Sequence, residues 1–469
     1  MDFFTIFDLA FLIGFCLFVG IFLYTRRKKL ERDGWLFLYK TSLGIKLIDY
    51  VGDKYKKTLN FLSYISIGVG YILMGTMLYL LGKIVYIYIA YPQIVRAIKV
   101  PPILPLVPYL PQVFQLDFLP PFYFTYWIII IAVVAITHEF AHGIFARCNK
   151  IKIKSTGFGF LGPFLAFFVE QDEKDMENKS IFSQLAVLSA GTFANILTAI
   201  FFLVIMWGFF SVGFTASGVV FDTYSYSAVN ISDILSVNGI NLENPNYENI
   251  LNLVDGEKFD VVKTKNGDYL VTKEILEQQT EGDILALYDD APAINAELVG
   301  AITEINNVKI INLDDLQTEL EKYSVGEKIK IKTATNNGSN EYDIVLGENP
   351  RNGDAWLGIG FSEQGTESAF GKIISVLSSF KEKHVYYEPN YNWIIFVYNL
   401  LWWMIFISIS VALVNMLPVG IFDGGRVFYL TILAITKDEK KAKKSFSIVT
   451  WLFLFLLFVL MLFWVLSFI

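Results

Sequence analysis

The sequence carries little charge for its length. Asp, Glu, Lys and Arg make up 18% of the 469 residues and hydrophobic residues 54%, and the mean hydropathy is +0.48. So few charges do not cover the apolar surface in water, which excludes an ordinary soluble protein and favours a membrane as the solvent. The net charge of −7, without any basic, aromatic-rich stretch, also argues against nucleic acid as a partner.

Cysteine and histidine are scarce as well. The two cysteines, Cys16 and Cys148, lie far apart, in or beside apolar segments, so we expect neither a disulfide framework nor a CxxC metal site. The chain has three histidines, and two of them stand four positions apart. That pair is therefore the most informative local feature of the sequence.

Six apolar runs are long enough to cross a bilayer: residues 3–24, 61–91, 122–145, 182–214, 393–417 and 446–469. The first lacks the basic start and small-residue cleavage site of a signal peptide, so we expect it to be retained. Lys and Arg cluster in residues 26–29, 147–154 and 437–444. By the positive-inside rule these three loops are cytoplasmic, and the N-terminus and residues 216–365 lie outside.

Eight of the 14 prolines fall between the second and third runs, in a segment that is otherwise apolar. Proline breaks helices and removes backbone donors. We therefore expect residues 92–121 to form a re-entrant or interfacial segment packed on the helices. A structural lid and a substrate gate are its alternative roles.

Residues 216–365 are polar and acidic, and they contain two similar units. Residues 236–240 correspond to 304–308, and 256–264 to 326–334. The alternation around each Gly-Glu-Lys predicts a strand, and residues 313–323 have helical spacing. The insert resembles tandem PDZ domains, which typically add an extended peptide to a sheet edge. The usual Gly-Leu-Gly-Phe-type loop is not evident, so peptide binding and a purely steric limit on access remain alternatives.

Residues His138-Glu139-Phe140-Ala141-His142 match the pattern HExxH. On a helix, residues i and i+4 share a face, so both imidazoles can reach one zinc ion with Glu139 beside them as general base. The motif lies within an apolar run, where an ionisable side chain is costly unless it is paired or binds metal. Two core histidines that donate to neighbouring carbonyls are the structural alternative.

A catalytic zinc site needs a third protein ligand and one open position. The third and fifth runs cross in the same direction, so their C-terminal ends reach the same depth. His142 precedes the basic loop closely enough to place a metal roughly 10 Å inside the cytoplasmic boundary. At the matching end of the fifth run, Pro418 ends the helix and glycines after Asp423 permit a tight turn. We expect Asp423 to be the third ligand; a helix N-cap for residues 425–435 is the alternative.

HExxH in one run and N-x-x-P-x4-D-G in a later one resemble the site-2 protease family of intramembrane zinc metalloproteases. The resemblance covers about residues 122–214 and 393–430. It implies that His138, His142 and Asp423 hold one catalytic zinc ion and that Glu139 is the catalytic glutamate. Residues 157–170 occupy the place of the family's membrane-associated strands, which implies that they hold substrate in extended form.

The segment from Ala190 to Asn195 is similar to the family's A-G-P-x-x-N pattern, with Thr192 in place of proline. Gly420 likewise stands where a second proline often follows Pro418. Asn195 is a candidate donor to the developing oxyanion, and helix packing is its structural alternative. Asn415 is a second polar candidate, for substrate binding.

The expected fold is a polytopic α-helical membrane protein with about six transmembrane helices and an extracytoplasmic β-rich insert of two PDZ-like domains. Its expected parts are residues 1–121 (two helices and the proline-rich segment), 122–214 (first catalytic part), 215–285 and 286–365 (PDZ-like domains), 366–392 (linker), 393–430 (second catalytic part) and 431–469 (basic loop and last helix).

The expected function is zinc-dependent hydrolysis of peptide bonds in transmembrane segments of other proteins, in the cell membrane. The expected partners are those substrates, the lipid bilayer and peptide segments at the PDZ-like domains. A membrane metal transporter and a catalytically silent peptide-binding scaffold are the alternatives. Exchange of Glu139 separates the three.

Overall fold

The computed structural model describes residues 3–34, 36–92, 95, 101–102, 105–116, 119–161, 164–256, 259–279, 282–335, 338–350, 352–361 and 378–466. Parts of the predicted proline-rich segment, of the first Gly-Glu-Lys motif, of the strand-like segment (162–163) and of the linker (366–377) lie outside these residues. The chain forms two compact units, residues 1–208 with 395–469, and residues 209–394.

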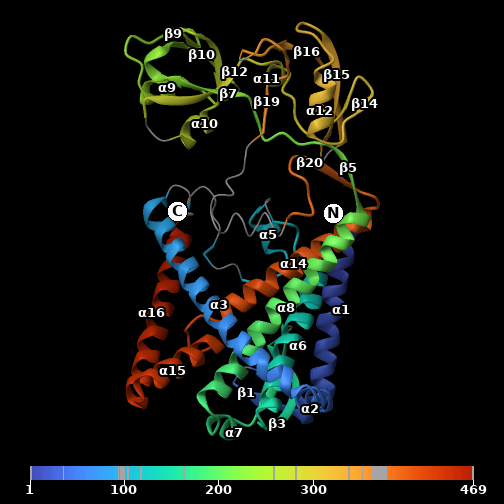
Figure 1. The fold of residues 1–469 in the computed structure, drawn as a ribbon, viewed down its shortest axis with the longest axis vertical. Helices are drawn as coiled ribbons and strands as arrows, with labels where there is room; N and C mark the ends of the chain where they lie inside the picture. Colours follow the sequence, from blue (N-terminus) through green and yellow to red (C-terminus); the bar gives the residue numbers. More distant parts are fainter. Residues whose placement is uncertain are drawn as a thin grey trace. The chain divides into compact units, whose positions relative to one another are not determined.

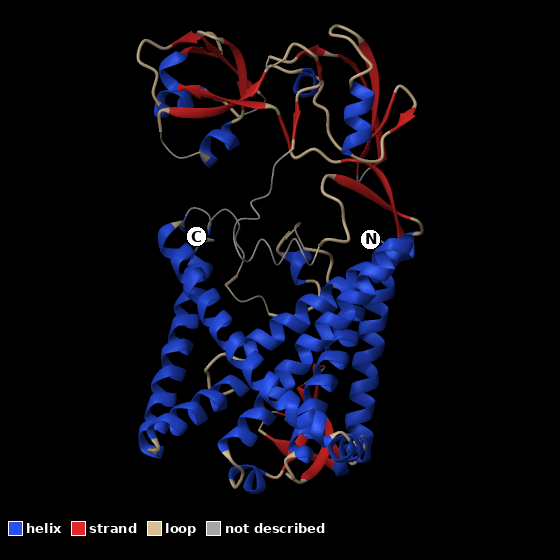
Figure 2. Cartoon of the chain, viewed as in Figure 1, coloured by secondary structure: helices blue, strands red, loops and turns tan. Residues whose placement is uncertain are grey.

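Six helices within the described residues are long and apolar enough to cross a membrane, which confirms the predicted number. They are α1 (Phe3–Arg26), α3 (Lys56–Ala90), α6 (Phe124–Cys148), α8 (Ile181–Gly213), α14 (Asn392–Asn415) and α16 (Glu439–Leu466) (Figures 1 and 2). Only 11% of the most apolar window of α1 and 6% of that of α16 is buried. Apolar helices that bury so little against the protein require lipid around them, so this is a multi-pass membrane protein.

A small antiparallel sheet lies in the first unit, in the order β1 (Leu30–Asp33), β2 (Leu36–Thr41), β3 (Ile153–Leu161) and β4 (Phe164–Gln171). Together with the short helices α2 (Ile45–Lys54) and α7 (Glu173–Glu177) it lies at one end of the helices (Figure 1). The strand-like segment predicted over residues 157–170 thus forms β3 and β4. Strand β4 is at the edge of this sheet in the described part of the chain.

The helix that carries HExxH is fixed at both ends. At its start, the buried carboxylate of Asp8 on α1 accepts hydrogen bonds from the backbone N–H groups of Phe124 and Thr125, each at 2.7 Å. Because the first N–H groups of a helix have no partner within it, this carboxylate acts as their cap. Toward the other end, Gly143 packs closely against Ile48 of α2 and Val169 of β4.

The described part of the proline-rich segment packs against α6 and α14. It includes the short helix α5 (Leu110–Val113). The indole N–H of Trp127 donates to Leu106 O at 2.9 Å, and that of Trp403 donates to Pro121 O at 3.2 Å. Because backbone carbonyls outside a helix need donors, these tryptophans let a non-helical chain lie against the bundle.

The described part of the second unit holds two larger antiparallel sheets and two small two-stranded ones, β17 (Gly347–Glu348) with β18 (Ala355–Trp356) and β19 (Ile359–Gly360) with β6 (Thr223–Tyr224). The first larger sheet has the order β7 (Tyr226–Asn230), β12 (Ile284–Asp289), β11 (Gly267–Val271), β10 (Asp260–Thr264), β8 (Ile234–Val237) and β9 (Ile240–Asn241). The second has the order β16 (Gly338–Val345), β15 (Lys328–Thr335), β13 (Ala301–Ile305), β5 (Phe214–Val219) and β20 (Val385–Pro389), with β14 (Val308–Lys309) paired to β13.

The predicted strands after each Gly-Glu-Lys form β10 and β15, and the predicted helix forms α12 (Leu313–Leu320). The predicted division at residues 285 and 286 falls inside β12. Strand β5, within the range predicted for the first copy, instead pairs with β13 of the second sheet. Local alternation does not encode such long-range pairing, which explains the difference.

Candidate metal centre

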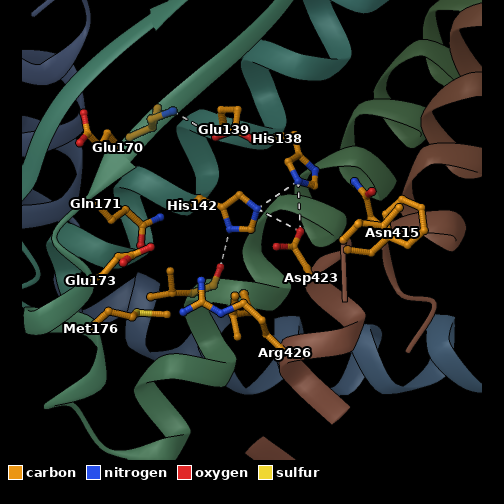
Figure 3. A pocket seen from close by; sticks show the side chains of 15 residues that line it. His138, Glu139, His142, Glu170, Gln171, Glu173, Met176, Asn415, Asp423 and Arg426 are labelled. Atoms are coloured by element: carbon orange, nitrogen blue, oxygen red, sulfur yellow. Dashed lines mark hydrogen bonds and ion pairs between the residues drawn. The ribbon is translucent and has the colours of Figure 1, made fainter. Parts of the chain in front are cut away.

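The two histidines of HExxH lie on one face of α6, as their spacing requires. Their Nε2 atoms are 3.0 Å apart, and both side chains are buried. Burial of two imidazoles in an apolar helix bundle requires either hydrogen-bond partners or a shared ion. Figure 3 shows both rings directed toward the same point, where Asp423 also lies.

Asp423 reaches the histidines from the first turn of α15 (Asp423–Thr436). Its Oδ2 atom lies 3.3 Å from Nε2 of His138 and 3.3 Å from Nε2 of His142. The N-cap position of α15 is held by Phe422, without a side-chain cap. The alternative of Asp423 as a helix N-cap therefore does not describe this structure.

The glycines after Asp423 serve close packing rather than a special turn. A Cβ on Gly424 would lie 2.3 Å from the carbonyl carbon of Met416, and one on Gly425 would lie 2.3 Å from Val419 O. Neither glycine is among those with positive φ. Residues 416–420 follow the end of α14, so these glycines let α15 start directly against that segment. This contact holds the Asp423 carboxylate at the depth of the histidines.

The second ring nitrogen of each histidine has a partner on α8. Nδ1 of His142 lies 2.7 Å from Val187 O, so it donates its proton there. Nδ1 of His138 lies 3.1 Å from the side-chain amide of Asn195, which is fully buried. A hydrogen bond at Nδ1 fixes the tautomer and leaves Nε2 with a lone pair for a metal. Both histidines therefore present Nε2 toward Asp423.

Gly191 on α8 makes room for these two nitrogens. A Cβ on this residue would lie 2.4 Å from Nε2 of His142 and 2.6 Å from Nε2 of His138. Any other residue would displace the rings. In the sequence, Gly191 falls within the segment from Ala190 to Asn195, and a glycine in an apolar helix is the only signal of its role.

Glu139 and Asn415 lie beside the histidines, in the wall of the same cavity. This cavity has a volume of about 440 Å³ and is also lined by polar side chains, among them Glu170, Gln171 and Arg426 (Figure 3). The Oε2 atom of Glu139 accepts a hydrogen bond from the backbone N–H of Val169 on β4, at 3.1 Å. Asn195 is not in the cavity wall and contacts His138 from its far nitrogen.

The three side chains fit a zinc ion. One ligand atom from each of His138, His142 and Asp423 lies within 4.8 Å of the others. Ligands at about 2.0 Å from zinc in a tetrahedron are about 3.3 Å apart, and the observed separations are 3.0 and 3.3 Å. Two imidazoles and one carboxylate are a donor set that zinc takes at catalytic sites.

Six membrane-length helices, an HExxH helix and a facing aspartate together define a membrane metalloprotease. The model of Peptidase family M50 matches residues 126–460, well over half of the chain. The chain belongs to this family, which is that of the site-2 proteases and whose metalloproteases use zinc. No curated protein matches the chain.

Proposed function

We propose that this chain is an intramembrane zinc endopeptidase that cuts the transmembrane segments of other membrane proteins. The observation that carries the proposal is the meeting of His138 and His142 on α6 with Asp423 at the start of α15, with Glu139 beside them. An apolar helix bundle gains nothing structurally from three ionisable side chains at one point, so these residues indicate a functional site.

The three candidate zinc ligands and Glu139 have different roles in the proposed reaction. His138, His142 and Asp423 would hold zinc, which supplies a Lewis acid for the peptide carbonyl and lowers the pKa of a coordinated water. Glu139 accepts a proton from the attacking water and returns it to the amide nitrogen as the carbon–nitrogen bond breaks. The 440 Å³ polar cavity gives water a way to Glu139.

The substrate must be unwound before it is cut, because a helix hides its peptide groups in internal hydrogen bonds. Strand β4 lies at the edge of its sheet among the described residues, and Val169 on that edge donates to Glu139. We propose that an extended substrate segment pairs with this edge. The amide of Asn415, in the cavity wall, is the candidate donor to its carbonyl groups. Asn195 is turned toward the far side of His138, which favours a positioning role over an oxyanion role.

Orientation follows from the basic loops. With residues 26–29, 147–154 and 437–444 in the cytoplasm, the N-terminus and the two-sheet insert lie outside. The insert then serves either to bind peptide segments, as PDZ domains do, or to exclude substrates with bulky outer domains.

A metal transporter would need ionisable side chains along its helices. Asp8, one of the few, is committed to the N–H groups of α6. A silent scaffold would not need Glu139 beside a donor set of zinc geometry. Both alternatives are therefore less well supported than the protease.

The decisive experiment compares Glu139→Gln, Asp423→Ala and the control Glu177→Gln, an exposed carboxylate outside the cavity wall. Each is reconstituted with a transmembrane substrate and analysed for zinc. We expect Glu139→Gln to keep zinc but lose cleavage, Asp423→Ala to lose both, and Glu177→Gln to keep both. Undiminished cleavage by Glu139→Gln would refute the assignment, and zinc flux without cleavage would favour transport.

A further inference from the structure

A second cavity adjoins the metal centre. Its volume is about 230 Å³, and it shares His138, Glu139 and Asn415 with the polar cavity described above. The other described residues that line it are all apolar: Leu106, Ile131, Val134, Ala135, Ile407 and Val411. The catalytic glutamate thus lies between a polar space and an apolar one.

A third cavity continues the apolar one toward the proline-rich segment. It has a volume of about 420 Å³ and shares Leu106, Ile407, Val411 and Asn415 with the second cavity. Four residues of the proline-rich segment join Leu106 in its wall: Pro102, Pro105, Val107 and Pro111. The three cavities therefore lie next to one another between this segment and the two histidines, and Asn415 lines all three.

The polar first cavity and the more apolar second and third cavities suit different occupants. Charged and amide side chains such as Glu170, Gln171 and Arg426 suit water and protons in the first cavity. Away from His138, Glu139 and Asn415 the wall of the second cavity is apolar, and the wall of the third is apolar except at Ser410 and Asn415. Apolar walls offer water few partners, so these parts favour an apolar guest. A cavity of about 150 Å³ with apolar walls already binds benzene, so 230 Å³ accommodates a leucine, methionine or phenylalanine side chain.

We propose that the 230 Å³ cavity is a specificity subsite that receives a large apolar side chain of the substrate, next to the peptide bond that is cut. This proposal rests on the proposed protease function. The neighbouring 420 Å³ cavity takes the adjoining apolar residues, so the proline-rich segment is a wall of the substrate path. Asn415 lies where the substrate passes from apolar to polar surroundings, and its amide can bond the backbone there.

The test uses one reconstituted transmembrane substrate in which the residues flanking the cut are changed one at a time to Ala, Leu or Phe. Wild type should cleave the Leu or Phe form about 10- to 100-fold better than the Ala form at one of these positions. Val411→Phe fills the subsite, so it should abolish this preference while the Ala form is still cut. The control Val204→Phe makes the same change at a position on α8 that is 65% exposed, and it should behave as wild type.

A cross-linking measurement gives a result that does not depend on turnover. In Glu139→Gln with both native cysteines changed to serine, Val411→Cys should form a disulfide with a cysteine placed at the preferred substrate position. Val204→Cys should not.

The outcomes separate the two proposals. If wild type cleaves the substrate but shows no side-chain preference, or if Val411→Phe keeps that preference, the subsite is wrong and the protease stands. Failure of wild type to cut any member of the series overturns the protease and the subsite with it. Should Val411→Phe fail to bind zinc, Ala135→Leu, which fills the same cavity from α6, takes its place, and the cross-link decides independently.

Discussion

The side-chain amide of Asn195 lies 3.1 Å from Nδ1 of His138, and the Oδ1 atom of this asparagine has no hydrogen-bond partner among the described residues. When Nε2 of His138 binds a metal, Nδ1 carries the proton and must donate. Rotation of the amide by half a turn places Oδ1 at Nδ1 of His138, where it accepts that proton. The hydrogen-bond requirement of a metal-bound imidazole assigns this orientation of the amide.

Asn195→Leu should therefore weaken zinc binding about 10- to 100-fold, because the ring loses the acceptor that fixes its tautomer. Asn195→Asp keeps an acceptor and should restore most of the affinity. Competition with a calibrated chelator measures the affinity without recourse to cleavage. Thr192→Val, a buried neighbour on α8 whose hydroxyl donates to Ser189 O, is the control. Equal zinc affinities for Asn195→Leu and wild type would contradict the positioning role.

Gly191→Ala should abolish zinc binding, because a methyl group would lie where the two Nε2 atoms now are. Gly208→Ala makes the same change on the same helix, where a Cβ meets nothing within 4 Å. Metal content of the purified proteins measures the effect. A full zinc complement in Gly191→Ala would show that the rings shift without losing the metal and would contradict this role.

The grouping of His138, His142 and Asp423 could be predicted from helix periodicity and from the order of the apolar runs. HExxH places His138 and His142 on one helical face whatever the surroundings, and the order of the apolar runs brings Asp423 to the same depth. The roles of Val187 and Gly191 could not be predicted, because they depend on how α8 packs against α6. For the same reason Gly424 and Gly425 were assigned to a turn, whereas the structure shows them packed against the segment that follows α14.

The helices were predictable from apolar length, and the strands β10 and β15 from alternation. Sheet membership was not, since β5 pairs with β13 across more than 80 residues. Asp8 illustrates the same limit. In the sequence it is an isolated acidic residue in an apolar run, and only the structure shows the helix end that it caps.

Asp8→Ala should lower the free energy of unfolding by about 1–3 kcal/mol, because two buried backbone N–H groups at the start of α6 lose their acceptor. Tyr109 also donates to this carboxylate, so the proline-rich segment should loosen as well. Thermal unfolding in detergent measures the first effect, and hydrogen exchange over residues 105–116 measures the second. Thr25→Ala, at an exposed site on α1, should leave both unchanged. A wild-type melting temperature for Asp8→Ala would show that the cap contributes nothing.

In the insert, the carboxylate of Glu319 on α12 accepts hydrogen bonds from two side chains. The Nζ atom of Lys322 lies 2.6 Å from its carboxylate, and the hydroxyl of Tyr323 donates to it at 2.9 Å. The hydrogen bond from the Lys322 ammonium group, with that from Tyr323, holds the pKa of Glu319 below its ordinary value, against the effect of burial. A carboxyl group whose pKa is lower in the folded state than in the unfolded one stabilises the fold above the unfolded pKa, and this contribution is lost as the pH falls through the folded pKa.

Glu319→Gln should therefore lower the urea midpoint of the second sheet at pH 6. The difference from wild type should shrink below about pH 4.3, where even an unfolded glutamate protonates. Limited proteolysis at sites within residues 301–345, carried out at increasing urea concentration, measures the unfolding of this sheet in the full-length protein. Glu341→Gln, an exposed carboxylate on β16 that pairs with Lys330 at 3.4 Å, should change the midpoint little at either pH, because exposed ion pairs contribute little. A Glu319→Gln effect that grew as the pH fell would have the wrong sign for a carboxylate held in its charged form by Lys322.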